Sequence, residues 1–144
     1  MVMNCRSPIA SKSVSPAVPF LLAPNGLTDF VAIGARQFIT IERSFTAGAG
    51  VSIRLFHADA RGSTDISGLT SVAGQSIQAV RKSLLLDLGT LRNDDDSALV
   101  LDNIEGITFG PERNGRRTLI LVSDNNFSVT QFTQFVAFEL APAP

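Results

Sequence analysis

Short apolar runs separated by turn residues are the feature that most limits how this chain can fold. The runs FITIE, VSIRLFH, SLLLDL, TLILVS and QFVAFEL are rich in β-branched and aliphatic residues and are bounded by Gly, Pro, Asn or Asp. Such runs are typical of β-strands. A short helix over residues 69–82 is the one alternative, which Ser71, Gly74 and Ser76 weaken. The pattern therefore predicts an all-β protein.

The two halves of the chain repeat one strand pattern. NGLTDFVAIG and QFITIERSF in the first half match DNIEGITFG and RTLILVSDNNF in the second, with Leu27 aligned to Ile104. The sequence offset between Leu27 and Ile104 exceeds the roughly 40–50 residues of common propeller repeats. Loops over residues 60–78 and 89–101 account for the excess. A third strand follows in each half, VSIRLFHAD and TQFVAFEL, and only the first half adds a fourth, VRKSLLLDL.

Four strands followed by three predict a partial β-propeller of about two antiparallel four-stranded blades. Propeller blades are four-stranded sheets arranged around a central channel, and rings often complete the last blade with a strand from the other end of the chain. SPAVPFLLA is the candidate for that N-terminal strand. We expect an irregular segment over residues 1–15, the propeller fragment over 16–140 and a tail over 141–144.

Composition excludes several classes of function. The 144 residues carry a net charge of −1, so no general attraction to nucleic acid or an anionic membrane is expected. Cys5 is the sole cysteine and His57 the sole histidine, which excludes disulfides and zinc sites built from thiolates or several histidines. No nucleophile-elbow motif accompanies the serines. AVPFLLAP is short and interrupted by Pro19 and Pro24, so it reads as mature, soluble chain.

Polar residues stand at the ends of the paired strands. In an antiparallel hairpin, the start of the first strand and the end of the second lie at the same end of the sheet. We therefore expect two polar clusters at one rim. The first cluster comprises Asp102, Asn103, Glu105, Asp124, Asn125 and Asn126, and the second comprises Asn25, Thr28, Asp29, Glu42 and Arg43.

These clusters suit a hard cation and a phosphate. Carboxylate and amide oxygens are the ligands that calcium prefers, and a bound calcium ion can hold a phosphate group. Arg43 and Arg54 could contact phosphate oxygens directly. The alternative is that Asp124, Asn125 and Asn126 simply end strands by accepting hydrogen bonds within turns. For Glu105, one residue inside an apolar strand, a partner or a ligand is expected because an unpaired buried carboxylate is costly.

Several segments carry a family resemblance. NGLTDFVAIGARQFITIERSF, DNIEGITFGP, GRRTLILVSDNNFS and TQFVAFEL resemble the C-terminal part of the phytase-like domain, described as having esterase-like activity of phytase, over about residues 16–140. The resemblance implies a β-propeller-like fold in a bacterial protein, commonly exported to the periplasm or beyond, with acidic residues that carry phosphoester hydrolysis. Domains of that family are longer, so earlier blades are expected to be missing here.

Together these arguments give a first hypothesis, a fragment of a phytase-like phosphoester hydrolase that binds a cation, calcium for preference, and a small phosphate ester. Its predicted catalytic residues are Glu105, Asp102 and Glu42, its substrate-binding residues Arg43, Arg54 and Asn103, and its metal ligands Asp124, Asn125 and Asp102. The alternative is a noncatalytic structural or interaction module that needs missing propeller blades as a partner, or that associates with itself through open sheet edges.

Overall fold

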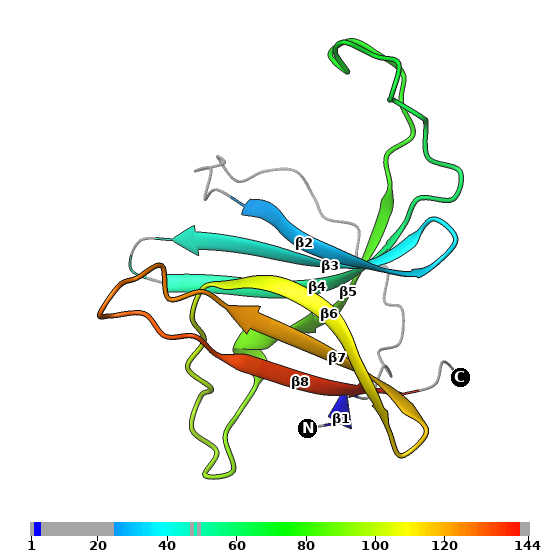
Figure 1. Cartoon of the computed structure of the whole chain (residues 1–144). Coiled ribbons are helices and arrows are strands. Elements are labelled where there is room, and N and C mark those ends of the chain that lie inside the picture. The colour runs from blue at the N-terminus through cyan, green and yellow to red at the C-terminus, as the bar shows by residue number, and fades with distance from the viewer. Residues whose placement is uncertain (1, 4–24, 47, 49, 142–144) are drawn as a thin grey trace.

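The computed structural model describes residues 2–3, 25–46, 48 and 50–141 (Figure 1). Its regular elements, in chain order, are β1 (Val2–Met3), β2 (Asn25–Gly34), β3 (Gln37–Thr46), β4 (Gly50–Asp59), β5 (Arg81–Asp87), the short 3-10 helix η1 (Leu88–Thr90), β6 (Ile104–Arg113), β7 (Arg116–Ser123) and β8 (Phe135–Leu140). The predicted all-β class is confirmed.

The strands form two sheets. One sheet has the order β2-β3-β4-β5, with antiparallel neighbours throughout. In the other, β6, β7 and β8 are antiparallel and the two-residue β1 lies parallel to β8, so the order is β1-β8-β7-β6. An N-terminal strand therefore does join the second sheet, but it is Val2–Met3, and SPAVPFLLA lies outside the described residues. So do most of the predicted irregular segment and most of the predicted tail.

The helix considered over residues 69–82 is absent from the structure. Residues 60–80 form a loop with turns that projects away from the sheets (Figure 1), and β5 begins at Arg81. Strand VRKSLLLDL is thus confirmed in its main part. The Asn-Gly turn between β6 and β7 also forms as its sequence indicates, with positive φ at Asn114 (53°) and Gly115 (70°).

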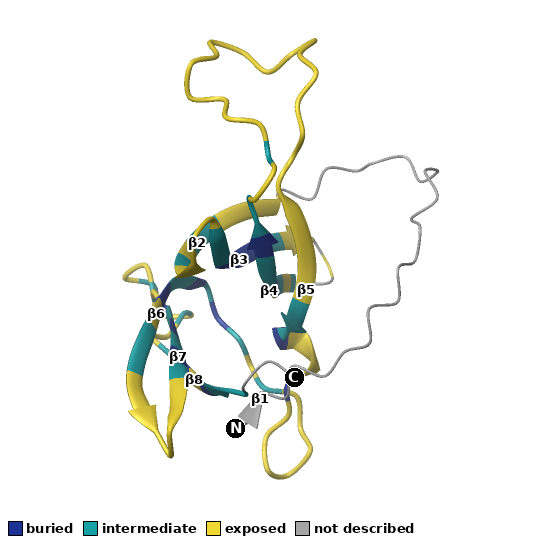
Figure 2. Ribbon diagram, turned by 90° about the vertical axis from the view of Figure 1, so that its right-hand side faces the viewer, coloured by how far each residue is buried: buried dark blue, intermediate teal, exposed yellow. Residues whose placement is uncertain are grey.

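The hydrophobic core lies between the two sheets. Alternate residues of β3, β4 and β7 point into it, and each large buried side chain stabilises the fold by about 1.5–3 kcal/mol. The fully buried large side chains of this core are Ile41, Ile53, Leu55, Leu88, Ile104, Leu119, Leu121 and Phe138. Figure 2 shows how burial is distributed along the strands of the two sheets.

The sheets are splayed rather than parallel. They approach each other along β2 and β6 and diverge towards β5 and β8 (Figure 2). The segment between β5 and β6 fills the wider part, because Leu88 and Leu91 join the core and Leu99 and Leu101 pack against it. Asp87 starts this segment by accepting a hydrogen bond from the Gly89 backbone N–H (3.0 Å).

Both hairpins that begin the repeated units contain a bulge at the same place. Leu27 pairs with Glu42 and is followed by a register shift at Thr28, and Ile104 pairs with Ser123 and is followed by a register shift at Glu105. The alignment of Leu27 with Ile104 therefore agrees with the strand registers. The described residues form two stacked sheets and no closed ring, so the partial propeller stays a proposal.

Candidate functional site

An ion pair joins the polar ends of the two sheets. Arg43 on β3 lies on the inner side of its sheet, and its Nη1 donates to Oε1 of Glu105 on β6 at 3.3 Å. The Asn103 amide donates to the same oxygen. Because Glu105 occupies the bulge in β6, its side chain is turned from the direction that regular alternation would give it. The bulge thus brings the carboxylate to the other sheet.

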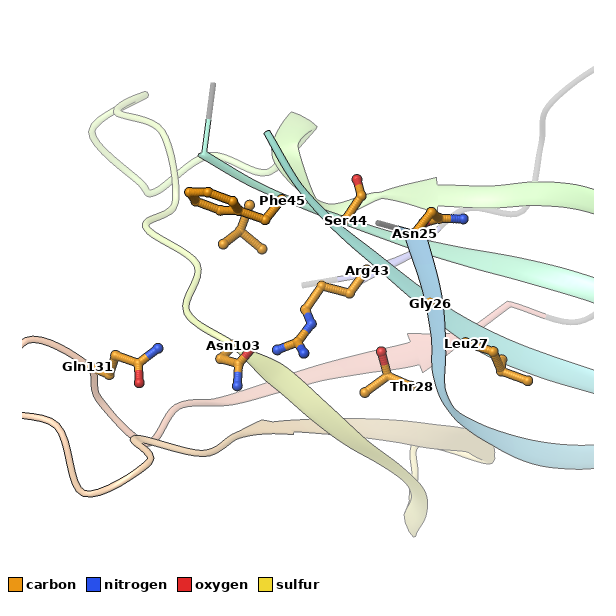
Figure 3. A pocket seen from close by; sticks show the side chains of 10 residues that line it. Asn25, Gly26, Leu27, Thr28, Arg43, Ser44, Phe45, Asn103 and Gln131 are labelled. Carbon is orange, nitrogen blue, oxygen red and sulfur yellow. The ribbon is translucent and has the colours of Figure 1, made fainter. Parts of the chain in front are cut away.

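Arg43 and Asn103, the two residues that contact Glu105, line a cleft of about 700 Å³ at the end of the sheets. Arg43 extends from β3 towards Asn103, while Gln131 approaches from the loop between β7 and β8 (Figure 3). The full lining is Asn25, Gly26, Leu27, Thr28, Arg43, Ser44, Phe45, Val51, Asn103 and Gln131. A guanidinium group surrounded by amide and hydroxyl groups is suited to an anionic ligand.

The ion pair is weak enough to exchange. The Arg43 and Glu105 side chains are 32% and 38% exposed, and pairs of this exposure contribute about 0–1 kcal/mol to stability. The guanidinium can therefore turn towards a phosphate in the cleft at little cost in free energy. Glu105 would keep its hydrogen bond from Asn103.

Asp102 has an anchoring position in the structure. Its Oδ1 accepts from the Asn103 backbone N–H (2.7 Å), and its Oδ2 accepts from the Phe132 backbone N–H (2.6 Å). Ser123 holds the same loop, since its Oγ donates to the Phe132 carbonyl and accepts from the Gln134 N–H, both at 2.8 Å. Together these contacts fold the loop between β7 and β8 towards the cleft.

Asp124 and Asn125 lie where the hairpin geometry predicted, at the same end as Asn103. The Asp124 backbone N–H donates to the Asn103 carbonyl (3.3 Å). Their own side chains close turns, because Asp124 Oδ1 accepts from the Asn126 N–H (3.1 Å) and Asn125 Oδ1 accepts from the Phe127 N–H (3.2 Å). These contacts are the ones expected of residues that end a strand.

Glu42 lies apart from this cluster. Glu42 and Arg43 are consecutive in β3, so they point to opposite faces of the sheet. Glu42 accepts from Lys82 and from Asn25 Nδ2 (3.0 Å), on the outer face. Burial raises the pKa of this carboxyl, but the hydrogen bonds from Lys82 and Asn25, together with the positive charges of Lys82 and Arg54, lower the pKa overall.

Arg54 also lies on the outer face. It stands opposite Glu42 in the register of β3 and β4, and its Nε donates to Asp87 Oδ2 (2.9 Å). The structure thus brings Arg43, Asn103 and Glu105 together and leaves Glu42 and Arg54 on the other side of the sheet. The predicted catalytic and substrate-binding roles of all five stay predictions.

A cation site is not evident in the donor set. Within residues 2–3, 25–46, 48 and 50–141, no group of three or more His, Cys, Asp or Glu side chains is arranged to hold a metal. Asp102, Asp124 and Asn125 already accept hydrogen bonds from the backbone. These residues therefore do not by themselves supply the 6–8 oxygens that calcium takes.

One residue of the site, Gln131, and the partner of a predicted site residue, Lys82, were missed in the sequence. Gln131 reaches the cleft because hydrogen bonds to Asp102 and Ser123 fold its loop back. No local sequence pattern predicts these hydrogen bonds. Lys82, the partner of Glu42, comes from a strand on the far side of the long loop. Asp29, predicted to lie near Glu42 and Arg43, pairs with Ile41 beside Glu42 and also links the sheets, because its Oδ2 accepts from the Ile107 backbone N–H (2.9 Å).

In the part of the chain that the structure describes, no helix is long and apolar enough to cross a membrane.

Comparisons with known proteins identify the family of this chain. No significant match is found among curated proteins or among solved structures. The model of one family matches residues 8–127, which is most of the chain. The chain therefore belongs to the phytase-like family, described as esterase-like activity of phytase.

Proposed function

We propose that this chain is part of a phytase-like hydrolase that binds a phosphate ester in the cleft beside Arg43. The observation that supports the proposal most directly is the position of the Arg43 guanidinium. It projects into a cleft lined by side chains of both halves of the chain and is held by a weak ion pair to Glu105. Membership of the phytase-like family supports a hydrolase at the coarser level.

In this proposal each residue has a definite task. Arg43 binds two phosphate oxygens through its planar guanidinium group. Asn103 and Gln131 donate hydrogen bonds to the remaining polar atoms of the ester. Glu105, released from Arg43 when the phosphate binds and still held by Asn103, accepts a proton from the attacking water as the water oxygen bonds to phosphorus. The P–O bond to the alcohol then breaks, and the departing alkoxide takes a proton from solvent water.

The calcium prediction is separate from the anion site. Two of the predicted ligands contact Asn103 directly, because Asp102 Oδ1 accepts from its backbone N–H and the Asp124 N–H donates to its carbonyl. A cation there would need further oxygens from main-chain carbonyls, water or substrate. The roles of Arg43, Asn103 and Glu105 in the proposed reaction do not involve a cation. Its requirement is tested by running every assay below with added calcium and again with a chelator.

Two variants test the site. Arg43→Gln should weaken binding of inorganic phosphate at least tenfold, measured by calorimetry, because the positively charged guanidinium group is lost. Glu105→Gln should lower kcat for a generic phosphomonoester more than it raises KM, because it removes the proton acceptor. Arg113→Gln is the matched control, since Arg113 lies 77% exposed beside the turn at the opposite end of β6.

Thermal unfolding of each variant separates a lost site from a lost fold. The ion pair is partly exposed, so both site variants should unfold within about 1 kcal/mol of the original protein. The proposal is overturned if the original protein neither binds phosphate nor hydrolyses the ester with calcium present. It is also overturned if Arg43→Gln and Arg113→Gln bind phosphate equally well.

A further inference from the structure

Both sheets carry an apolar face that points away from the core. On the β2–β5 sheet, Leu27, Phe30 and Leu84 are 60%, 55% and 51% exposed. On the other sheet, Phe135 is 72% exposed and shares its face with Val122, its partner in the register. We call these the β2–β5 outer face and the β6–β8 outer face. Large exposed apolar side chains gathered on one face of a sheet mark an interaction surface.

The repeat allows the β2–β5 outer face to be compared with the equivalent face of the second sheet. With Leu27 aligned to Ile104, Phe30 corresponds to Ile107, and both Ile104 and Ile107 are buried between the sheets. The registers extend this match to the second strand of each unit, where Phe38 and Thr40 correspond to Leu119 and Leu121, again buried. The face that is exposed on the first sheet is therefore the face that is buried on the second.

The converse holds for the β6–β8 outer face. Ile41 pairs with Leu55 in the first sheet, and Val122 pairs with Phe135 at the equivalent position in the second. Leu55 is fully buried between the sheets, whereas Phe135 is 72% exposed. The two sheets are thus stacked front to back, and the stack ends in two unlike faces.

These end faces are equivalents of the two faces that already pack together inside the molecule. We propose that copies of this chain stack head to tail, with the β6–β8 outer face of one copy on the β2–β5 outer face of the next. The contact would repeat the sheet-to-sheet interface within the chain. Because it joins two different surfaces, it is heterologous and gives a ring if the rotation closes and an open chain of copies if it does not.

The side chains on the β2–β5 outer face suit burial. Phe30 and Phe38 meet edge to face with ring centres 5.4 Å apart, which gives the interface an aromatic centre. The charged side chains of this face are already paired, Glu42 with Lys82 and Arg54 with Asp87, and Asn25 donates a further hydrogen bond to Glu42. Covering this face therefore leaves no unpaired charge, which is the condition under which a buried ion pair is tolerated.

Complementing variants test the head-to-tail arrangement. Phe30→Lys places a charge on the β2–β5 outer face and Phe135→Lys places one on the β6–β8 outer face, both at exposed positions. Light scattering and sedimentation velocity of the full chain should show association that grows with concentration. Each variant alone should stay monomeric. An equimolar mixture should form a 1:1 dimer that grows no further, because its two remaining faces are both blocked.

Val72→Lys is the control, since Val72 is an exposed apolar residue of the 60–80 loop, outside both faces. This variant should assemble as the original protein does, and circular dichroism should show all variants folded. The proposal is overturned if the original protein is monomeric up to millimolar concentration, or if mixing the two folded variants produces no dimer. Association that persists in either variant alone overturns it too. Phosphate binding through Arg43 is a separate property, so neither proposal stands or falls with the other.

Discussion

Replacing Asp102 separates an anchoring role from a chemical one. The carboxylate accepts two backbone hydrogen bonds, from Asn103 at 2.7 Å and from Phe132 at 2.6 Å, and the residue is only 9% exposed. Hydrogen bonds to a charged group contribute about 1.5–3 kcal/mol each. Because the Phe132 donor belongs to an exposed loop residue, we use the lower figure for each bond. Asp102→Ala should therefore destabilise the protein by about 3 kcal/mol.

Urea unfolding followed by circular dichroism measures this change. With an m-value of about 1–3 kcal/mol per M, a loss of 3 kcal/mol lowers the midpoint by about 1–3 M. Asp102→Asn keeps one acceptor oxygen and should lose about half as much. Asp94→Ala, in the exposed loop over residues 93–97, is the control and should change stability by less than about 0.5 kcal/mol. If Asp102→Ala unfolds at the same urea concentration as the original protein, the anchoring argument is refuted and a role in binding or catalysis regains priority.

Two further predictions concern stability. Glu42→Gln removes a carboxylate whose pKa is lowered, after the opposing effect of burial, by hydrogen bonds from Lys82 and Asn25, so the variant should be less stable at neutral pH. Since a lowered pKa stabilises the fold only above the pKa of the unfolded chain, the difference should fade as pH falls below about 4.3, which chemical unfolding across pH would show. Gly110→Ala should lower Tm by several degrees, because the new Cβ would lie 2.6 Å from Ile120 Cδ1 and 2.6 Å from Thr118 Oγ1, which its hydrogen bond to the Pro111 carbonyl holds in place. Gly26→Ala is the control, since its Cβ meets nothing within 4 Å.

The strands were largely predictable from the sequence because their signals are local. Runs of β-branched and aliphatic residues, each ended by turn residues, predict every strand from β2 to β8, and the Asn-Gly turn predicts the β6–β7 hairpin. The core connector between β5 and β6 was not predictable. Leu91 and Leu101 stand in a segment rich in Asp and Asn. They pack with the core only because the segment fills the space between the diverging sheets.

The site was predictable only in part, because pairing places residues at one end of a sheet but does not fix the face. Alternation along β3 could have separated Glu42 from Arg43, since neighbouring residues point to opposite sides. The bulge that turns Glu105 towards Arg43 has no clear local signature, although Gly106 follows it. The bond from Phe132 to Asp102 spans 30 residues and depends on tertiary structure.

The connector between β5 and β6 also determines how the molecule comes apart. Its leucines occupy the space that the diverging sheets leave, so each half of the repeat depends on it for a complete interior. Neither half is then a self-sufficient folding unit, and both should melt in one cooperative transition. Displacing these leucines would thus open the interior that both sheets share, whereas a proteolytic cut in the outward 60–80 loop would leave that interior intact.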